Sequence, residues 1–382
     1  MSLTLIRNGT VVDPSKSIME RMDVLVDGKN IQDVASHISS INASSIVDAQ
    51  GLFVIPGLVD LHTHISSSIC PYLGLEPDKF CLIRGTTTAV DAGSTGELTF
   101  EAFRRFVMSV SHTSTFAFLN SESLGMIEYP PEESKQKWAD LLTADNETYY
   151  PNFTNLGNIK RVIEANKGKI VGLKWAHHGR NSLKSTSDIG KKLGIRTMFE
   201  NHHMPWGLRH LRGGDIITHL YHNFYNKLEE RVDGILDEDG EIAEEFYKAK
   251  KAGVVFDVGH GGGSFSWEVA EKAFENDLLP DTISTDLWLN NVNGPVYDLL
   301  TTMDKFMLLG MSLEDTVKAT TVKPASSIDS NAGTLNPGRL ADIILIRNSE
   351  CQNLLIDSYG KIRRASRKLT LIKVFKDGKI FK

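Results

Sequence analysis

Strand-like apolar runs alternate with longer helical stretches through the middle of this 382-residue chain. This alternation is typical of parallel βαβ units, in which a helix connects each strand to the next. We expect strands at Leu58–His64, Thr86–Asp91, Thr115–Asn120, Ile170–Trp175, Ile195–Glu200, Asp215–His219, Val254–Val258 and Thr282–Asp286. Eight parallel strands that are joined by right-handed crossovers close naturally into a barrel. The pattern therefore predicts an α/β fold of the (β/α)8 TIM type.

The two ends of the chain have a different character. Short β-rich runs occupy both, and turn signals such as Asn8-Gly9 and Asp377-Gly378 separate them. Each end is too short to form a domain alone. We therefore expect residues 1–54 and 335–382 to form one small β-sandwich domain, beside a barrel that spans residues 55–334.

Composition narrows the classes of function. The formal net charge of -6 shows no basic surplus, which argues against nucleic acid or an anionic membrane as a partner. An apolar run of about 18 residues, long enough to span a bilayer, is missing from the sequence. The three cysteines are scattered and odd in number, which favours a reducing compartment. The N-terminus also lacks the apolar core of a signal peptide, so we expect a cytoplasmic protein.

Side chains that can bind metals stand at the ends of several expected strands. Catalytic groups of α/β barrels gather at the carboxyl ends of the strands, so these positions share one rim. His62 and His64 lie two residues apart at the end of the first strand, where alternation points both imidazoles the same way. Lys174, His219 and Asp286 lie at the ends of the fourth, sixth and eighth strands. Each alone is more often structural, but together they predict a catalytic metal site.

Longer motifs surround these residues. They are Pro56–His64, Gly85–Thr88, Val90–Ser94, Gly214–His219, Asp257–Phe265, Ser284–Leu287 and Gly338–Asp342. With them, nearly the whole chain resembles the amidohydrolase superfamily. Within that superfamily it is most similar to the dihydroorotase-like N-acyl deacetylases, some of which are labelled adenine deaminases.

The resemblance implies a metal-dependent hydrolase with two divalent ions, which we expect to be zinc. His62, His64 and Asp286 would bind the more buried ion, and His219 would bind the second with a residue of the fifth strand. Lys174 would react with carbon dioxide to form a carbamate that bridges the two ions. Asp286 would also act as the catalytic proton carrier, taking a proton from the attacking hydroxide and delivering it to the leaving nitrogen.

The fifth strand departs from the family pattern, because the family's histidine falls on Glu200. If the strand continues, His202 has the same parity as Glu200 and also points into the barrel. His203 has the opposite parity. We favour His202 as the ligand, with Glu200 as the alternative, and a site that holds only one ion tightly also remains open.

Two further stretches could contact the substrate. His260 and Gly261 begin a glycine-rich turn after the seventh strand, where main-chain amides can approach a ligand closely. Comparable family members usually place an arginine shortly after the lysine. Here the lysine is followed instead by Trp175 and Ala176, and then by His177, His178, Gly179 and Arg180. Exposure to solvent is the simpler interpretation for His177, His178 and Arg180, although we retain Arg180 as a candidate.

The resemblance implies attack of a hydroxide on the amide or ester carbonyl of a small acylated, carboxylate-bearing compound, as in a deacetylase. One alternative is hydrolytic deamination of a purine-like ring, and another is hydrolysis of a cyclic amide. A third is a barrel that serves only as a scaffold and has no catalytic activity. We expect a small-molecule substrate, no nucleic-acid or membrane partner, and a homo-oligomer.

Overall fold

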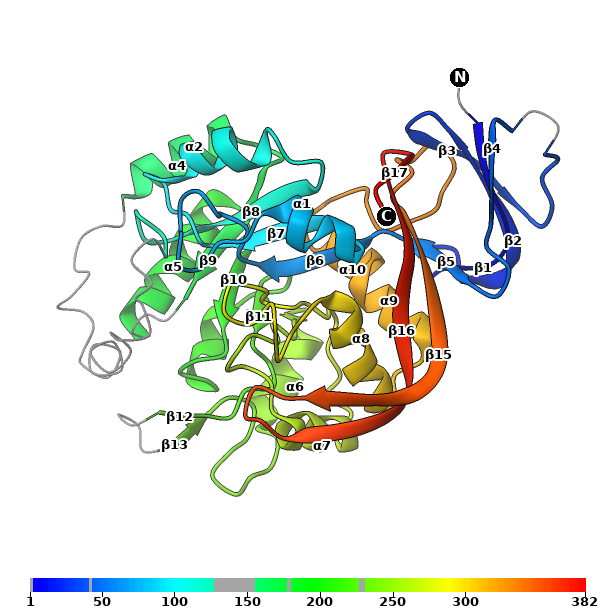
Figure 1. Ribbon diagram of the computed structural model, residues 1–382. Coiled ribbons are helices and arrows are strands. Elements are labelled where there is room, and N and C mark those ends of the chain that lie inside the picture. Colours follow the sequence, from blue (N-terminus) through cyan, green and yellow to red (C-terminus); the bar gives the residue numbers. More distant parts are fainter. Residues whose placement is uncertain (1–2, 41–42, 127–154, 177–179, 227–230) are drawn as a thin grey trace.

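The computed structural model describes residues 3–40, 43–126, 155–176, 180–226 and 231–382. Figure 1 shows a body of strands and helices with a second sheet, built from both ends of the chain, at one side. Across these described ranges, none of the helices combines the length and the apolar character that crossing a bilayer requires.

A parallel sheet of seven strands forms the centre of the body. Its strands are neighbours in the order in which they occur along the chain, as βαβ units predict. They are β6 (Leu58–Thr63), β7 (Thr86–Ala92), β8 (Ser114–Asn120), β9 (Ile170–Trp175), β10 (Thr197–Glu200), β11 (Ile216–Thr218) and β14 (Val255–Phe256). Almost every residue of these strands is buried, as expected for a parallel sheet that is covered on both faces.

The expected eighth strand, Thr282–Asp286, does not form a regular strand of this sheet, so the closed (β/α)8 barrel is not confirmed. Isolated parallel bridges instead join this part of the chain to Asp257 on one side and to Thr63 on the other. Asp286 has a left-handed backbone with φ of 48°, which ends the extended run. The segment therefore lies between the last and first strands without forming a regular ladder with either.

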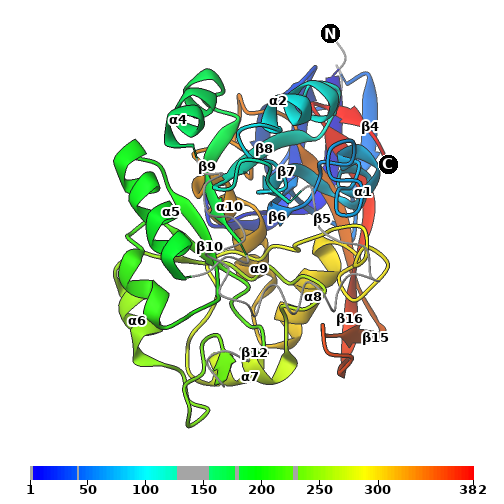
Figure 2. The same cartoon turned by 90° about the vertical axis from the view of Figure 1, so that its left-hand side faces the viewer.

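Helices and short turns of helix connect the strands. The helices are α1 (Pro77–Phe80), α2 (Phe100–Phe103), α4 (Leu156–Ala165), α5 (Arg180–Leu193), α6 (Glu244–Lys251), α7 (Trp267–Glu275), α8 (Leu299–Leu308), α9 (Leu313–Thr320) and α10 (Val322–Ser326). Shorter turns are η1 (Leu82–Arg84), η2 (Arg104–Met108) and η5 (Trp206–His210), and a small hairpin pairs β12 (Phe224–Asn226) with β13 (Arg231–Asp233). Side chains of Asn155, Asp298 and Ser312 cap α4, α8 and α9 by accepting main-chain hydrogen bonds. In Figure 2, α4, α5 and α6 lie on the side opposite the long terminal strands.

Both ends of the chain enter one mixed sheet of eight strands, in the order β17-β16-β15-β5-β1-β2-β3 with β4 beside β1. The strands are β1 (Leu3–Asp13), β2 (Ile18–Asp27), β3 (Asn30–Ala35), β4 (Ser45–Asp48), β5 (Phe53–Pro56), β15 (Ile343–Ile356), β16 (Ile362–Lys376) and β17 (Lys379–Ile380). The structure confirms one mixed sheet built from both termini, while the predicted β-sandwich is not confirmed. The N-terminal strand β5 pairs edge to edge with the C-terminal strand β15, so the two ends are continuous in one hydrogen-bonded sheet.

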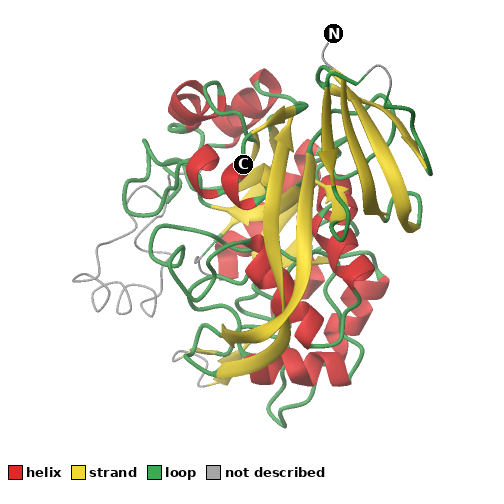
Figure 3. Ribbon diagram, turned by 45° about the vertical axis from the view of Figure 1, so that its right-hand side comes forward, coloured by secondary structure: helices red, strands yellow, loops and turns green. Residues whose placement is uncertain are grey.

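The far halves of β15 and β16 leave this sheet and run along the body as a long hairpin (Figure 3). Asp304 of α8 holds them there, because it accepts hydrogen bonds from the Leu369 amide at 3.0 Å and from Asn353 Nδ2 at 3.0 Å. These strands are much longer than the short β-rich runs that the sequence predicts at this end of the chain. Two register shifts interrupt the regular pairing of this hairpin, and these irregularities hide its length in the sequence pattern.

Candidate metal centre

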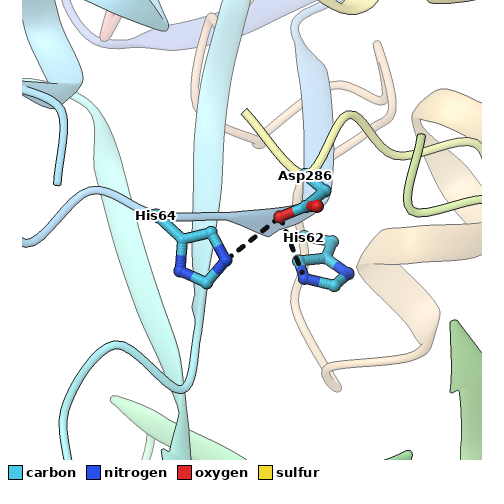
Figure 4. Close-up of side chains that lie close together, drawn as sticks. All are labelled: His62, His64 and Asp286. Atoms are coloured by element: carbon cyan, nitrogen blue, oxygen red, sulfur yellow. Dashed lines mark ion pairs between the residues drawn. The ribbon is translucent and has the colours of Figure 1, made fainter. Parts of the chain in front are cut away.

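Three candidate ligands converge at the carboxyl end of β6. One carboxylate oxygen of Asp286, Oδ1, lies 3.0 Å from His64 Nε2 and 3.4 Å from His62 Nε2. One ligand atom from each residue lies within 4.8 Å of the other two, and all three residues are buried. Figure 4 shows the carboxylate of Asp286 facing both imidazole rings. We call His62, His64 and Asp286 the inner cluster.

Main-chain hydrogen bonds bring the inner cluster together. The Asp286 amide donates to the carbonyl of His62 at 2.7 Å, and the His64 amide donates to the carbonyl of Leu287 at 2.9 Å. The left-handed backbone at Asp286 turns its side chain toward β6. Such a conformation is uncommon for a residue other than glycine, although aspartate tolerates it better than most. The geometry therefore depends on chain segments more than 200 residues apart.

Hydrogen bonds at the far ring nitrogens orient the imidazoles of the inner cluster. Thr218 Oγ1 donates to Asp257 Oδ2 at 2.7 Å, so it can accept a hydrogen bond from His62 Nδ1 at 2.8 Å. His62 then carries its proton on Nδ1 and directs the lone pair of Nε2 into the site. His64 Nδ1 lies 2.8 Å from Ser94 Oγ. Partners of this kind set the orientation and tautomer of histidines that bind metals.

Lys174 lies fully buried between the inner cluster and the fifth strand. Its Nζ is 3.4 Å from His62 Nε2 and 3.5 Å from Glu200 Oε1. Gly93, with φ of 88°, makes room for it, because a Cβ there would lie 2.6 Å from Lys174 Cγ. A buried lysine amine requires compensation, and here the carboxylate of Glu200 supplies it.

Glu200 connects the remaining candidates. Its Oε1 lies 3.6 Å from His219 Nε2, and its Oε2 lies 3.6 Å from His202 Nε2. We call Lys174, Glu200, His202 and His219 the outer cluster. Among the described residues, only the inner cluster forms a compact set of three or more ligand atoms from histidine, cysteine and acidic residues.

The tautomer of His219 follows from its contacts. Its Nδ1 lies 2.7 Å from the carbonyl of Gly259, so Nδ1 carries the proton and Nε2 faces Glu200. Gly259 is required here, because a Cβ at this residue would lie 2.9 Å from His219 Nδ1. Burial lowers the pKa of His219, but the hydrogen bond to Glu200 and nearby carboxylates outweigh it, so the net pKa is raised. For His62, burial and the adjacent Lys174 hold the pKa well below its ordinary value.

The donor set fits a divalent metal. A neutral imidazole binds metals through its lone pair, and the low pKa of His62 keeps its ring neutral near pH 7. The inner cluster joins two imidazoles to a carboxylate, which is a common combination for zinc and related ions. The outer cluster offers two further imidazoles, a carboxylate and a buried amine.

The structure also locates the predicted substrate contacts. His260 is fully buried, and both ring nitrogens contact protein groups, Nδ1 the carbonyl of Gly261 and Nε2 the amine of Lys305. Gly261 lies against Asp286, because a Cβ there would be 2.4 Å from Asp286 Oδ2. Arg180 begins α5, but its side chain is not among the described ones, and residues 177–179 lie outside the described ranges. His203 lies beside Trp175, with ring centroids 6.3 Å apart.

Several residues that support the site are not among those predicted from the sequence. Asp257 accepts hydrogen bonds from Thr218, Thr282 and Ser284 at 2.6–2.7 Å, which joins the ends of β11 and β14 to the segment Thr282–Asp286. Asp60 likewise accepts from the amide and hydroxyl of Thr285, and burial raises its pKa to about 7. The sequence carries a signal for part of this support, because Thr218 and Thr285 stand next to the candidate ligands His219 and Asp286.

The fold and this site define a class of protein: an α/β protein with a parallel sheet, whose strand ends carry histidines and carboxylates that could hold a metal ion. A model of the amidohydrolase family matches residues 263–381. A deacetylase of Agrobacterium fabrum is 32% identical over 359 residues, which cover 90% of this chain and 83% of that protein. A deacetylase of Enterococcus faecalis is 28% identical over 99% of this chain and 98% of that protein.

Solved structures agree with these relatives. A crystal structure of an adenine deaminase is 27% identical, with a TM-score of 0.84 over 100% of both chains. A crystal structure of a dihydroorotase is 29% identical, with a TM-score of 0.84 over 99% of this chain and 98% of the other. The chain therefore belongs to the amidohydrolase family, whose members are hydrolases acting on C–N bonds.

Proposed function

We propose that this amidohydrolase removes an acyl group, most simply acetyl, from a small carboxylate-bearing compound. The inner cluster carries this proposal, because a carboxylate shared by two oriented imidazoles suits a metal-dependent hydrolase. The deacetylases that resemble this chain over most of its length support the choice of reaction. A small-molecule substrate suits such a site. We also propose that the protein forms a homo-oligomer.

We propose that His62, His64 and Asp286 hold one divalent ion, most simply zinc, and that the outer cluster holds a second. A bound divalent ion lowers the pKa of a water molecule and polarises the carbonyl that is attacked. Asp286 would accept a proton from the attacking water and return it to the leaving nitrogen. Its place between both imidazoles and the loop at Gly261 supports that role.

For the second ion, the contacts favour Glu200 over His202 as the residue of the fifth strand. Glu200 Oε1 approaches both Lys174 and His219, at 3.5 Å and 3.6 Å. His202 instead approaches the other carboxylate oxygen of Glu200 and is partly exposed. We therefore propose Glu200 with His219 as ligands, and His202 as a residue that orients Glu200.

We further propose that Lys174 is carboxylated by carbon dioxide. The ammonium group would lose one proton, and the neutral amine would then attack carbon dioxide and lose a second proton, which exchanges a cationic side chain for an anionic carbamate. The fully buried position of Lys174 between the two clusters supports this proposal, because an anion there could serve both ions. It would also remove the positive charge that repels a metal from His62.

Two structural proposals accompany this one. The segment Thr282–Asp286 would complete a (β/α)8 barrel as its eighth member, because Thr282 bridges to Asp257 and Leu287, the next residue after the segment, bridges to Thr63. Residues 1–54 with 335–382 would form the small domain, and residues 55–334 the hydrolase barrel.

An assay of acetate and ammonia release tests the function. Protein loaded with zinc would be screened against N-acetyl amino acids, an O-acetyl hydroxy acid, adenine and dihydroorotate, with an Asp286→Asn variant as the inactive control. Acetate release that Asp286→Asn abolishes would support the proposal. Ammonia release from adenine, or ring opening of dihydroorotate, would favour the alternatives suggested by the two similar crystal structures. If no substrate were turned over and the protein contained no metal, the result would favour the alternative that the barrel is a scaffold without catalytic activity.

A further inference from the structure

Lys305 is a buried lysine of α8 that lies outside both clusters. Its Nζ lies 2.6 Å from His260 Nε2, 3.0 Å from the carbonyl of Pro295 and 2.6 Å from the carbonyl of Ile356. An ammonium group has three N–H donors, and here it meets three acceptors. Burial lowers the pKa of Lys305 to about 7, so these contacts must offset a substantial desolvation cost. Lys305 therefore connects three separate segments of the chain, at His260, Pro295 and Ile356.

The proton on His260 follows from its neighbours. Its Nδ1 lies 2.9 Å from the carbonyl of Gly261, and a carbonyl can only accept a hydrogen bond. Nδ1 therefore carries the proton, and Nε2 accepts from Lys305. The ring of His260 also stacks on Phe265 with centroids 4.6 Å apart, and Lys305 Nζ lies 5.6 Å from the centre of the same Phe265 ring. Lys305 thus holds both ends of the glycine-rich loop, residues 259–265.

The tip of the C-terminal hairpin holds the same loop from its other side. Ser358 Oγ donates to the carbonyl of Gly261 at 3.0 Å and accepts from the Phe265 amide at 3.2 Å. Tyr359 donates its hydroxyl to the carbonyl of Gly263 at 2.8 Å. Figure 1 shows this hairpin running from the terminal sheet down to the region of α7. The terminal sheet and the loop are therefore connected directly.

The loop in turn touches the candidate catalytic carboxylate. Gly261 has φ of 55°, and its amide donates to the carbonyl of Thr285 at 2.9 Å. Its main chain approaches Asp286 Oδ2 so closely that a Cβ would lie only 2.4 Å away. Any shift of the loop would change the surroundings of this oxygen.

We propose that Lys305 is a positioning residue, which acts with Ser358 and Tyr359 to hold the glycine-rich loop against Asp286. In this arrangement His260 transmits the contact from Lys305 to the loop instead of binding the substrate. The kinetic consequence rests on the proposed function, whereas the mechanical link does not depend on it.

The test compares Lys305→Met with Lys376→Met in the full-length, metal-loaded protein. Lys376 is an equally buried lysine, but it joins Asp342 and Ser114 at the base of the terminal sheet. Hydrogen exchange of residues 259–265 would be measured with metal content and the kinetics of acetate release. We expect Lys305→Met to raise loop exchange and to lower kcat/KM at least about tenfold, with metal content unchanged. We expect Lys376→Met to lower Tm without either change.

Two further variants keep the test decisive if Lys305→Met fails to fold. Ser358→Ala and Tyr359→Phe each remove hydrogen bonds to the loop, and both should shift exchange and kcat/KM in the same direction by a smaller factor. Loop exchange and kcat/KM that follow the Lys376→Met control would overturn the proposal, as would faster exchange with unchanged kcat/KM. A wild-type protein without hydrolase activity would remove the proposed function, while the exchange comparison would still decide whether Lys305 holds the loop.

Discussion

The inner and outer clusters lie side by side yet are built differently. The inner cluster comes from β6 and the segment that hydrogen-bonds to it, and its carboxylate already faces both imidazoles. The outer cluster draws on three successive strands, β9, β10 and β11, and its carboxylate faces a lysine as well as histidines. The inner cluster has the arrangement of candidate metal ligands, whereas the outer one has the contacts of an ion pair. The proposed second ion would therefore require a chemical change at Lys174.

We expect the largest loss of activity on substitution of Asp286, whose carboxylate lies between both imidazoles of the inner cluster. Asp286→Asn keeps the shape of the side chain but removes the charge and the proton acceptor. We expect kcat to fall by about 10²–10⁴-fold, the usual contribution of a proton carrier. Steady-state kinetics would measure this loss, with the exposed Asp188→Asn as control. Retention of full activity would show that the inner cluster is not catalytic.

Metal content separates the two clusters most directly. Wild-type protein purified without chelators should hold about two divalent ions per chain. Lys174→Ala should lose activity and retain about one ion, because the inner cluster does not need the lysine. Elemental analysis of both proteins measures the result. Two ions in Lys174→Ala would contradict the bridging role, and none in wild type would contradict the metal site altogether.

A smaller effect, on metal affinity, is expected on removal of the hydrogen bond that orients His62 of the inner cluster. Thr218→Val removes the hydroxyl that accepts from His62 Nδ1 while keeping the volume of the side chain. Loss of such a partner weakens metal affinity by about 10–100-fold. Competition with a chromogenic chelator would measure the affinity. Thr302→Val, which removes a buried hydroxyl bonded to the Asp298 carbonyl in α8, is the control. Equal affinities in both variants would show that orientation of His62 is unimportant.

The smallest expected effect is on folding stability, and it concerns a buried carboxylate that has no cation beside it among the described residues. Glu200 has Lys174 beside it, whereas Glu122, after β8, is buried near Glu97. Burial and the charge of Glu97 raise the pKa of Glu122 to about 7. The folded state thus favours the protonated form, so this residue weakens folding progressively as pH rises from its ordinary pKa through 7.

The variant Glu122→Gln removes this penalty. We expect it to be more stable than wild type by about 1–3 kcal/mol above pH 7 and to match wild type near pH 4. Denaturant unfolding at several pH values would measure the difference. A constant difference at all pH values would show that the effect comes from packing instead of charge.

Periodicity in the sequence predicted most of the central sheet. The strand Ile170–Trp175 is confirmed at both ends, and the other strands of the parallel sheet fall within the expected ranges or differ by one or two residues. The expected strand Thr282–Asp286 failed because hydroxyl side chains and a left-handed Asp286 replace a regular ladder there. The sequence did not reveal that the two ends of the chain pair edge to edge, because this pairing depends on partners distant in sequence.

The sequence alone determined the inner pair of histidines. Two residues at i and i+2 on a strand must point the same way, so His62 and His64 share one face whatever surrounds them. Only the tertiary structure decided how Lys174 relates to Glu200, because the two residues lie on neighbouring strands and their contact depends on how β9 and β10 are staggered. The contact of His202 with Glu200 depends on the path of the chain just after β10. The same holds for Lys305 and the hairpin tip. Their contacts to the loop at Gly261 join segments about 45 and 100 residues away, which no local pattern can specify.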